Sequence, residues 1–458
     1  MEFLPDARLR EVVSGLNPWW TSGTLPPRPG RAGPHRVDAR RKKDDRPLLL
    51  CGPRRCGKTS TIYRWIGAHL GEAGDPREIV YLDLDHALLR LEPLGPLVDR
   101  VLKLAASSSA DTGRRPTLFL DGLQTIPDWP ARFKEVVETR PHPRIVGAAA
   151  MHPGNEENSY ETVTLTPMRL REFAESRGLP DLKLPALDLL EPEAPTEKDS
   201  AEEHLFDRVL DPLLADYLVR GGFPEAALAH DLRSAQAIVR DSVVSRAIYQ
   251  DLPAVVGVMK LADVERVLIA ALLKGGEPIQ AEAFADALEL DRQTVARYVE
   301  HLSRAFLLSS LKNYAAATDR SRARMTPGDP SLANALLERG ATVLAQPEPR
   351  RELLVSAVLG HVQDHVRERG FDLAYFKEGE LECDLVVVTP DGAIPLLVVD
   401  RDEVTEEEAA IVERLIKRFK VRHCFVLSRS GPRRREPVSF FESVIHLPAA
   451  YFLYALDA

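Results

Sequence analysis

The chain has 458 residues, 44% of them hydrophobic and 28% charged, a composition typical of a folded protein. This length exceeds what a single hydrophobic core usually serves, so about two to four domains are expected. The 60 Lys and Arg residues and 69 Asp and Glu residues give a formal net charge of -9. This negative net charge argues against the class of proteins that bind nucleic acids or other polyanions through an overall positive charge. Any contact with a polyanion would have to use a local basic face.

Cysteine usage and hydropathy both predict a cytoplasmic protein without a membrane partner. The cysteines Cys51, Cys56, Cys383 and Cys424 lack paired C-x-x-C spacing, which argues against a zinc knuckle and a disulfide framework. The N-terminal stretch "MEFLPDARLREVVSGLNPWW" has acids where a secretory leader would be basic. No apolar run approaches the length of about 20 residues that a membrane span needs.

Residues 1–46 predict an N-terminal helix followed by an irregular basic arm rich in Pro, Gly and Arg. Its cluster Arg40, Arg41, Lys42 and Lys43 either contacts phosphates or belongs to a solvated, flexible arm.

Residues 47–178 predict a doubly wound α/β domain. The apolar runs "PLLLCG", "EIVYLDLD", "PTLFLDG" and "PRIVGAAAM" alternate with amphipathic segments such as "TSTIYRWIGAHLGEAG". Strands of continuous hydrophobicity are typical of a parallel sheet that helices cover on both faces. We therefore expect four parallel strands with helices between them.

Four segments follow in chain order. Residues 179–204 mix Pro with acids and predict a linker or insertion, and residues 205–259 predict a helical lid. Residues 260–345 predict a winged-helix-like domain. Residues 346–458 predict a smaller α/β unit, because a helix precedes the strand-like runs "FDLAYFKEG", "ECDLVVVTP", "AIPLLVVD" and "HCFVLSR".

A helix-turn-helix candidate lies within residues 260–345. Three predicted helices are separated by "GGEP" and "ELD". The third has one apolar face, made of Val295, Tyr298, Val299, Leu302 and Phe306. Its first turns carry the DNA-contact candidates Arg292, Gln293, Thr294 and Arg297. Because Glu300 and the acidic "ADALELD" lie nearby, and such units also serve as protein-interaction modules, both kinds of contact stay open.

The strongest functional motif is "GPRRCGKTS", which satisfies G-x-x-x-x-G-K-[ST] between an apolar strand and a helix. Backbone N–H groups of such a loop curl around a phosphate, Lys58 adds positive charge at the β- and γ-phosphates, and the Thr59 hydroxyl can ligate Mg²⁺. Cys56 either packs as a small residue or is open to oxidation. We predict a nucleotide site formed by Gly52, Pro53, Arg54, Arg55, Cys56, Gly57, Lys58, Thr59 and Ser60.

The acid expected to hold Mg²⁺ together with Thr59 is Asp121, at the end of the strand "TLFLD". Asp121 could instead cap a turn. The next residue is Gly122, where an acid that polarises the attacking water would be expected. Asp83, Asp85 and Gln124 are the candidates for taking over that catalytic role.

At this point the sequence resembles the prokaryotic AAA-like ATPases that combine a P-loop domain, a helical and winged-helix segment, and a C-terminal restriction-endonuclease-like domain of unknown function. The resemblance rests on "GPRRCGKTS", "LFLDGLQTIPDW", "LTPMRLREF", "YLVRGGFPEA", "RAIYQDL", "RQTVARYVEHLSRAFLL" and "ECDLVVV", and covers residues 47–430 approximately. It implies a P-loop NTPase parallel sheet with a helical lid, a winged helix and a smaller nuclease-like α/β domain, with ATP and Mg²⁺ as cofactors.

Three departures from this family surround the phosphate loop. Gly122 replaces the family's glutamate, Ala148, Ala149 and Ala150 replace a polar sensor, and the usual Gly-Arg is missing before "LTP". Arg169 or Arg171 would act as an arginine finger in an oligomer, or belong to a salt-bridged surface. The pattern predicts that nucleotide binding is kept and that hydrolysis is slow or absent.

The nuclease-like domain is also incomplete. By resemblance, Glu352 and Asp384 occupy the first two metal-binding positions, whereas Val398 and Asp400 stand where the acid and the lysine of E-x-K belong. Valine cannot ligate a metal, and aspartate cannot supply the positive charge. DNA cleavage by this domain is therefore not expected.

We interpret the chain as an ATP-binding AAA-like protein in which nucleotide occupancy controls domain or partner arrangement, through a protein partner or self-association. One alternative is an active ATPase stimulated by DNA or a partner. A second is a nuclease-derived DNA-binding module with a vestigial P-loop. The residues do not decide between ATP and GTP.

Overall fold

The computed structural model describes residues 4–26, 46–72, 75–106, 115–154, 159–192, 206–256, 260–314, 322–367, 369–402, 404–421, 423–429, 434–437 and 443–456. The chain forms two compact units. The first comprises Met1–Thr166, Asp241–Leu261 and Arg304–Phe306, and the second comprises Pro167–Arg240, Ala262–Ser303 and Leu307–Ala458. Each unit is therefore built from segments that are distant in sequence.

The first unit contains a parallel sheet. Within the described residues it has five strands in the order β2-β3-β4-β1-β5, an order typical of P-loop proteins. The four predicted strands are confirmed, and the sequence analysis missed β5, which is only half-buried. The bounds are β1 Leu48–Cys51, β2 Ile79–Asp83, β3 Thr117–Asp121, β4 Arg144–Ala149 and β5 Glu161–Thr164.

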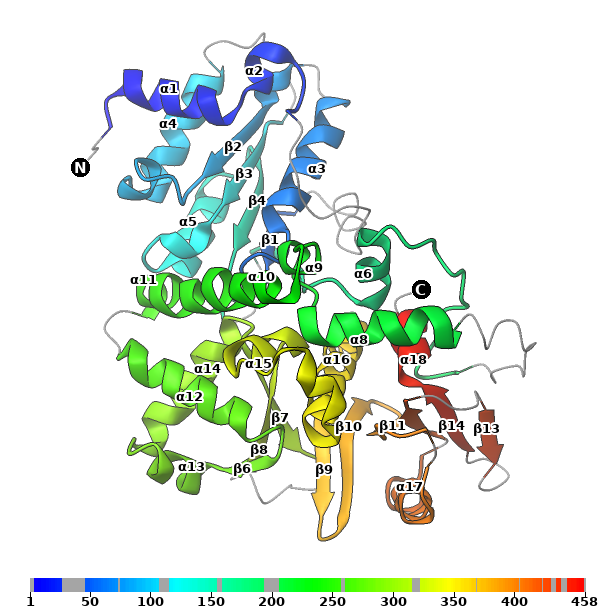
Figure 1. The fold of residues 1–458 in the computed structure, drawn as a ribbon. Helices are drawn as coiled ribbons and strands as arrows, with labels where there is room; N and C mark the ends of the chain where they lie inside the picture. The colour runs from blue at the N-terminus through cyan, green and yellow to red at the C-terminus, as the bar shows by residue number, and fades with distance from the viewer. Residues whose placement is uncertain are drawn as a thin grey trace. The chain divides into compact units, whose positions relative to one another are not determined.

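Helices cover both faces of this sheet (Figure 1). Alternate strand residues point to opposite faces, so Leu50 packs with α3 on one face while Leu49 packs with α4 and α5 on the other. This explains why the strands are apolar throughout. The helices and turns of this region are α1 Asp6–Leu16, α2 Trp19–Ser22, α3 Lys58–Leu70, η2 Pro76–Glu78, η3 Leu89–Leu91, α4 Leu94–Ala106, η4 Leu123–Thr125 and α5 Trp129–Thr139.

The N-terminal helices cover the edge strand β2. Asn17 donates from Nδ2 to the Tyr81 carbonyl at 2.9 Å and accepts from the Tyr81 N–H at 2.7 Å. Trp19 and Trp20 both donate to the Ile79 carbonyl. These bonds satisfy backbone groups that an edge strand would otherwise expose. The basic cluster Arg40–Lys43 lies outside the described residues.

The segment Asp241–Leu261 completes the first unit. It contains most of the π-helix η6 (Ile238–Ser245), the π-helix η7 (Ala247–Asp251) and the short helix α11 (Leu252–Val256). Both η7 and α11 contact η4, the turn that follows β3. Successive π-helical stretches are uncommon and often accompany functional sites.

The second unit contains a mixed sheet. Among the described residues its order is β13-β14-β12-β11-β10-β9-β7-β8-β6. The parallel pairing of β7 with β9 joins the strands of the predicted winged-helix-like segment to those of the C-terminal segment, a continuity that the sequence did not predict. The bounds are β6 Pro278–Gln280, β7 Leu308–Asn313, β8 Arg322–Pro327, β9 Asp372–Glu378, β10 Leu381–Thr389, β11 Gly392–Val398, β12 His423–Ser428, β13 Arg434–Pro437 and β14 Ser443–Pro448.

The helices of the second unit include the three predicted around the helix-turn-helix, now confirmed as α12, α13 and α14. Phe306 was expected on the last of these, but α14 ends at Arg304 and Phe306 adopts a left-handed φ of 61°. The bounds are α6 Leu170–Ser176, η5 Phe206–Leu210, α8 Asp211–Arg220, α9 Pro224–Ala227, α10 Leu232–Ala237, α12 Leu261–Leu273, α13 Ala281–Ala287, α14 Arg292–Arg304, α15 Pro330–Leu336, η8 Gly340–Ala345, α16 Pro347–Arg367, α17 Glu406–Phe419 and α18 Ala449–Leu456.

The glycine pair in "YLVRGGFPEA" forms a packed corner after α8. Asp329 accepts the Gly222 N–H at 2.9 Å, and a Cβ on Gly221 would lie 2.1 Å from Asp329 Oδ1. The Gly222 carbonyl accepts the Met168 N–H at 2.7 Å. No side chain fits at either position, so the pair has a structural reason to be glycine.

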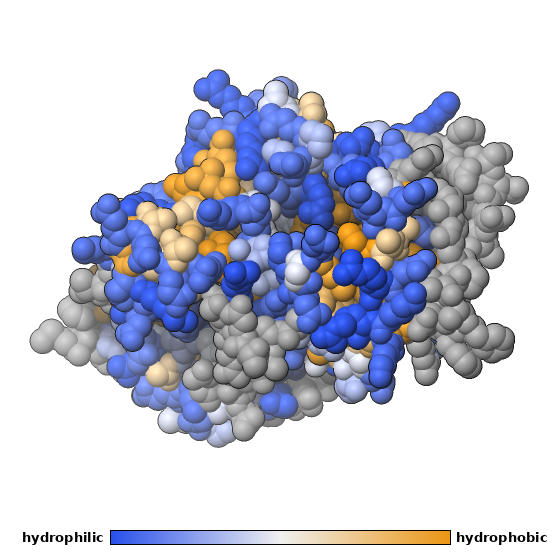
Figure 2. All heavy atoms as spheres, turned by 90° about the horizontal axis from the view of Figure 1, so that it is seen from below, coloured by the Kyte–Doolittle hydropathy of each residue, from blue (hydrophilic) through white to orange (hydrophobic). Residues whose placement is uncertain are grey.

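Residues 179–192 of the predicted linker lie against the C-terminal helix, where Tyr454 accepts the Leu182 N–H at 3.1 Å. Residues 193–204 lie outside the described part of the chain. Among the helices that are described, none combines the length and apolar character needed to cross a bilayer. Figure 2 shows a mostly hydrophilic face, with hydrophobic residues in separate areas.

Candidate functional site

The nine predicted nucleotide-binding residues, Gly52 to Ser60, lie in the loop between β1 and α3 and in the first turn of α3. A Cβ on Gly52 would lie 2.0 Å from the Leu165 carbonyl oxygen, so only glycine fits there. Gly57 precedes α3 with a left-handed φ of 107°. The backbone requires both glycines, and the loop ends at the positive end of a helix dipole.

The Lys58 side chain is folded over this loop. Its ammonium donates to the carbonyl oxygens of Gly52 at 2.8 Å and Pro53 at 2.7 Å, and only 9% of the residue is exposed. Both partners are neutral acceptors. A phosphate oxygen would be a stronger partner for an ammonium, because hydrogen bonds between two ionised groups are the stronger class.

Asp121 and Thr59 lie in direct contact. Thr59 Oγ1 donates to Asp121 Oδ2 at 2.6 Å, and the Tyr81 hydroxyl donates to the same oxygen at 3.1 Å. Burial raises the pKa of Asp121, although Thr59, Lys58 and Tyr81 partly offset that effect. The structure thus brings the two predicted metal-binding side chains together. The sequence analysis did not identify Tyr81.

The three catalytic candidates have different surroundings. Asp83 lies opposite Asp121 in the sheet register, and burial together with the Asp121 charge raises its pKa. Asp85 is exposed in the following turn, where its N–H donates to Asp83 Oδ1 at 3.0 Å. Gln124 is buried, and its side-chain oxygen Oε1 accepts the Ala150 N–H at 2.9 Å. Gln124 therefore holds the end of β4.

The backbone at Gly122 explains its identity. Gly122 has a left-handed φ of 84°, and a Cβ there would lie 3.2 Å from the Asp85 nitrogen. Residues with side chains rarely adopt this conformation, so a glutamate at 122 would require a different local backbone. Ala148, Ala149 and Ala150 are buried at the end of the neighbouring strand and offer no side-chain donor.

A buried ion pair holds the phosphate loop from the side. Arg54 Nε and Nη2 donate to the two carboxylate oxygens of Asp251, each at 2.6 Å. Asp251 is 1% exposed, and burial raises its pKa against the opposing effect of Arg54. It lies at the end of η7. The sequence analysis quoted "RAIYQDL" without a role for this acid, because its partner is 197 residues away.

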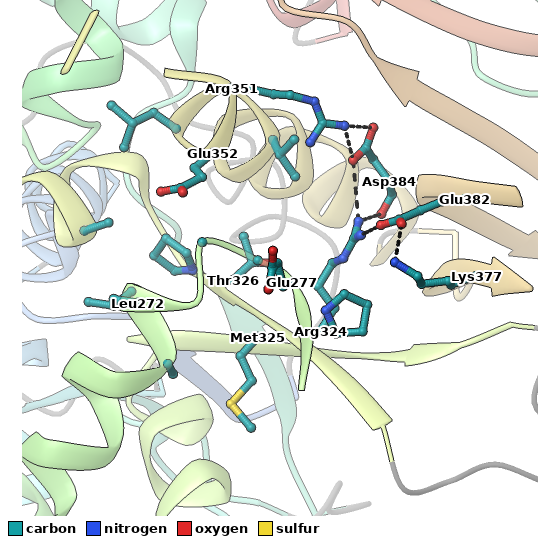
Figure 3. Close-up of a pocket in the computed structure, with 18 of the residues that line it drawn as sticks. Leu272, Glu277, Arg324, Met325, Thr326, Arg351, Glu352, Lys377, Glu382 and Asp384 are labelled. Carbon is teal, nitrogen blue, oxygen red and sulfur yellow. Dashed lines mark hydrogen bonds and ion pairs between the residues drawn. The ribbon is translucent and has the colours of Figure 1, made fainter. Parts of the chain in front are cut away.

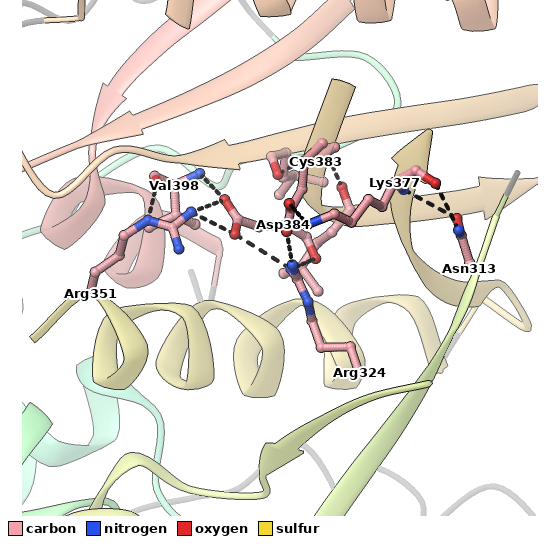
Figure 4. A network of polar contacts seen from close by, with 10 residues as sticks. Asn313, Arg324, Arg351, Lys377, Cys383, Asp384 and Val398 are labelled. Carbon is pink, nitrogen blue, oxygen red and sulfur yellow. Dashed lines mark hydrogen bonds and ion pairs between the residues drawn. The ribbon is translucent and has the colours of Figure 1, made fainter. Parts of the chain in front are cut away.

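Two of the four nuclease-like positions, Asp384 and Val398, lie in a cluster of polar contacts (Figure 4). Asp384 on β10 accepts from Arg351 Nη2 at 2.7 and 2.8 Å and from the Val398 N–H at 2.8 Å. Arg324 approaches the same carboxylate at 3.5 Å. These donors bind the two carboxylate oxygens of Asp384 that a metal ion would need as ligands.

The other two predicted positions point to other partners. Glu352 pairs with Arg339 at 2.7 Å. Asp400 lies 3.4 Å from Arg350 and 3.5 Å from Arg429, and burial raises its pKa. No group of three His, Cys, Asp or Glu side chains in the described ranges is arranged to hold a metal. The side chains present do not fit a nuclease metal centre.

The DNA-contact candidates lie at the start of α14. Arg292 forms an ion pair with Glu282, and the Arg297 guanidinium lies 5.8 Å from the ring centre of Tyr298. Gln293 is exposed, and the backbone N–H of Thr294 donates to Asp291 Oδ1 at 2.9 Å. Asp291 places a negative charge at this helix start, which does not favour a phosphate there.

The arginine-finger candidates are engaged within the second unit. Arg169 is 6% exposed and pairs with Asp364 at 2.6 Å. Arg171 pairs with Asp181 at 2.8 Å and lies over the Tyr454 ring. The expectation of a salt-bridged surface fits Arg171, whereas Arg169 is buried.

Comparison with known proteins identifies two regions. Residues 44–174 match the AAA domain family, and residues 211–342 match a domain of unknown function (DUF8612). The first match gives the chain an AAA-type P-loop domain, a fold that implies ATP binding. The search of curated proteins found no match.

Two solved structures are similar at low scores. One is a Signal Transduction ATPase with Numerous Domains (STAND) protein with a tetratricopeptide repeat sensor from Pyrococcus horikoshii, with 11% identity and a TM-score of 0.24. The match covers 75% of this chain and 47% of that chain, so this chain spans about half of that protein. The other is protein VC1899 from Vibrio cholerae, with 10% identity and a TM-score of 0.19, covering 90% and 96% of the two chains.

Proposed function

We propose that the first unit binds ATP with Mg²⁺ and that nucleotide occupancy, with slow or absent hydrolysis, controls the arrangement of the chain or a partner. The observation that carries this proposal is the Thr59–Asp121 contact of 2.6 Å beside Gly122. Two side chains suited to a metal are in contact, and a glycine occupies the position where an acid that activates water would be expected.

Thr59 and Asp121 fit Mg²⁺ as a donor set. Magnesium prefers oxygen ligands and is usually held by one or two carboxylates together with substrate phosphates and water. A hydroxyl and a carboxylate in contact at the end of β3 meet that description. When bound, Mg²⁺ would neutralise charge on the β- and γ-phosphates.

Impaired hydrolysis follows from the groups around the loop. Gly122 has no side chain, and its left-handed φ of 84° disfavours the glutamate that would replace it. Gln124 is bonded to the end of β4, and the alanines there offer no donor to a γ-phosphate. Activation of a water molecule therefore lacks its usual residues.

The Arg54–Asp251 pair provides a route from the phosphate loop to the segment Asp241–Leu261. Arg54 belongs to the loop that is predicted to hold phosphate, and its partner Asp251 ends η7. Asp251 accepts from Nε and Nη2 of Arg54, which leaves Nη1 for a phosphate, so a bound phosphate would be linked to η7 through this one side chain. Nucleotide occupancy would then be sensed by η7 and α11.

The test measures ATP binding by calorimetry and phosphate release by a coupled assay, with Mg²⁺, with and without duplex DNA. Lys58→Ala should weaken ATP binding by about tenfold or more, because it removes one ionised hydrogen bond to phosphate. Lys103→Ala, an exposed lysine on α4 of the same unit, is the matched control and should bind as the wild type does.

Binding that depends on Lys58 without phosphate release in any condition supports the proposal. Absence of ATP binding would contradict it. Lys58-dependent release only with DNA would favour the second candidate, a stimulated ATPase. One observation favours that candidate: Asp83 lies in register with Asp121 and its pKa is raised, a property useful to a general base.

A further inference from the structure

A cavity of about 380 Å³ lies within the second unit (Figure 3). Its walls come from the end of α12 with the turn after it, from β8, from the first turns of α16 and from β9 and β10. Ligand pockets for small molecules typically have volumes of about 300–1,000 Å³. The cavity includes the Asp384 cluster, so the position expected for a nuclease metal opens onto a space of ligand size.

The carboxylates on one side of the cavity are already neutralised by cations of the protein. Asp384 is held by Arg351 at 2.7 Å, and Glu382 is held by Lys377 at 2.7 Å and by Arg324. Figure 3 shows these side chains together on one wall. A divalent metal would have to displace a guanidinium from Asp384, so a metal is not the ligand that this wall fits.

The cavity walls also carry two further carboxylates, the exposed Glu277 and Glu352, which pairs with Arg339. Several hydrogen-bond donors on the walls nevertheless have no acceptor. Arg324 and Thr326 are 4% and 2% exposed, and Arg324 Nε and Thr326 Oγ1 are buried with no hydrogen-bond partner in the described structure. Such orphaned atoms are costly unless a ligand or water satisfies them. Arg351 Nη1 also has no partner in the ranges that the structure covers, and Arg322 adds an exposed guanidinium.

We infer that this cavity binds a small phosphorylated molecule. Arginine recognises phosphate with several N–H donors in a fixed plane, and three arginines, Arg322, Arg324 and Arg351, line the cavity. A phosphoryl group offers several acceptor oxygens to donors that have no acceptor. The volume admits a sugar-sized body and excludes duplex DNA. Unlike the proposed ATP site, this site does not depend on the phosphate loop.

The experiment is calorimetric titration of the full chain with ribose 5-phosphate, with ribose as the control for the phosphoryl group. Four proteins are compared: the wild type, Lys58→Ala, Arg322→Gln and Thr326→Val. We expect saturable binding of ribose 5-phosphate by the wild type and Lys58→Ala, and no binding of ribose. Each cavity variant should bind about tenfold more weakly, the loss expected for one hydrogen bond to an ionised group.

Arg322→Gln avoids the Asp384 network and should leave the fold intact, because Arg322 is exposed. Circular dichroism and thermal unfolding verify this. Two results would overturn the inference. One is no saturable binding, which means that water alone fills the cavity. The other is binding that Lys58→Ala abolishes and the cavity variants keep, which places the phosphate in the P-loop.

Discussion

The phosphate loop of the first unit and the Asp384 cluster of the second both depart from a catalytic pattern, and they differ in what holds their charged side chains. Lys58 is held by neutral carbonyl oxygens, at 2.8 and 2.7 Å. Asp384 is held by the guanidinium of Arg351, at 2.7 and 2.8 Å. An incoming phosphate can outcompete a carbonyl for an ammonium, but a metal must break an ion pair to reach Asp384. The first site is therefore suited to an anionic ligand, whereas the Asp384 carboxylate is not available to a metal.

The largest effect expected from this comparison is on stability in the second unit. Asp384→Ala should lower the free energy of unfolding by about 3–5 kcal/mol, because it leaves the buried Arg324 and its neighbour Arg351 without this carboxylate. Chemical denaturation of the full chain measures the change. Asp372→Asn, at an exposed position on β9, is the control and should change stability by less than about 0.5 kcal/mol. An Asp384→Ala protein as stable as the wild type would mean that the network is dispensable.

The corresponding change in the first unit should affect ligand binding and leave the fold intact. Thr59→Val removes one oxygen ligand and the hydrogen bond to Asp121 while keeping the side-chain shape. We expect the gain in ATP affinity on adding Mg²⁺ to fall by about tenfold, and affinity in EDTA to stay unchanged. Titrations with ATP in Mg²⁺ and in EDTA measure the two affinities. Equal losses in the two conditions would show that Thr59 contacts the nucleotide and has no part in holding the metal.

An effect of similar size, but on stability, is expected at Gly122, where the departure is built into the backbone. Gly122→Ala should cost about 1–2 kcal/mol of stability, because the left-handed φ of 84° disfavours any residue with a Cβ. Gly122→Asn should cost less, since asparagine tolerates this conformation better. Thermal unfolding of the pair measures the difference. Equal stability of all three proteins would mean that the loop relaxes freely, and that a glutamate could be accommodated there.

The sequence predicted the parts of both sites that are local in the chain. Glycine spacing, a preceding apolar run and a following helix are all local features, and they located the phosphate loop. The strands β1 to β4 were predictable because their hydrophobicity is continuous. Strand β5, with the sequence "ETVT", was missed because it is short and half-buried.

The sequence could not predict which residues or strands that are far apart in the chain contact each other. Arg54 and Asp251 are 197 residues apart, and nothing local marks them as partners. At the second site the family resemblance selected Glu352, yet the neighbouring Arg351 faces Asp384, because consecutive residues on α16 point in different directions. Likewise, the pairing of β7 with β9 joins strands about sixty residues apart into one sheet.

The smallest expected effect concerns pH and tests whether Asp121 acts as a metal ligand. Burial raises its pKa above the ordinary value of 3.8, so the carboxyl keeps its proton to a higher pH than an exposed aspartate does. Only the ionised form can hold Mg²⁺. The gain in ATP affinity from Mg²⁺ should therefore fall as the pH is lowered toward this raised pKa. The fall should be less than about tenfold per pH unit, which is the limit for the uptake of one proton.

The control for this experiment is Asp121→Asn, because the phosphates of ATP also take up protons as the pH falls. In Asp121→Asn the ATP phosphates still titrate, whereas the carboxyl group at position 121 is absent. If the wild type and Asp121→Asn show the same pH dependence, the contact between Thr59 and Asp121 is only structural, and the first site would resemble the second in having no metal-binding carboxylate.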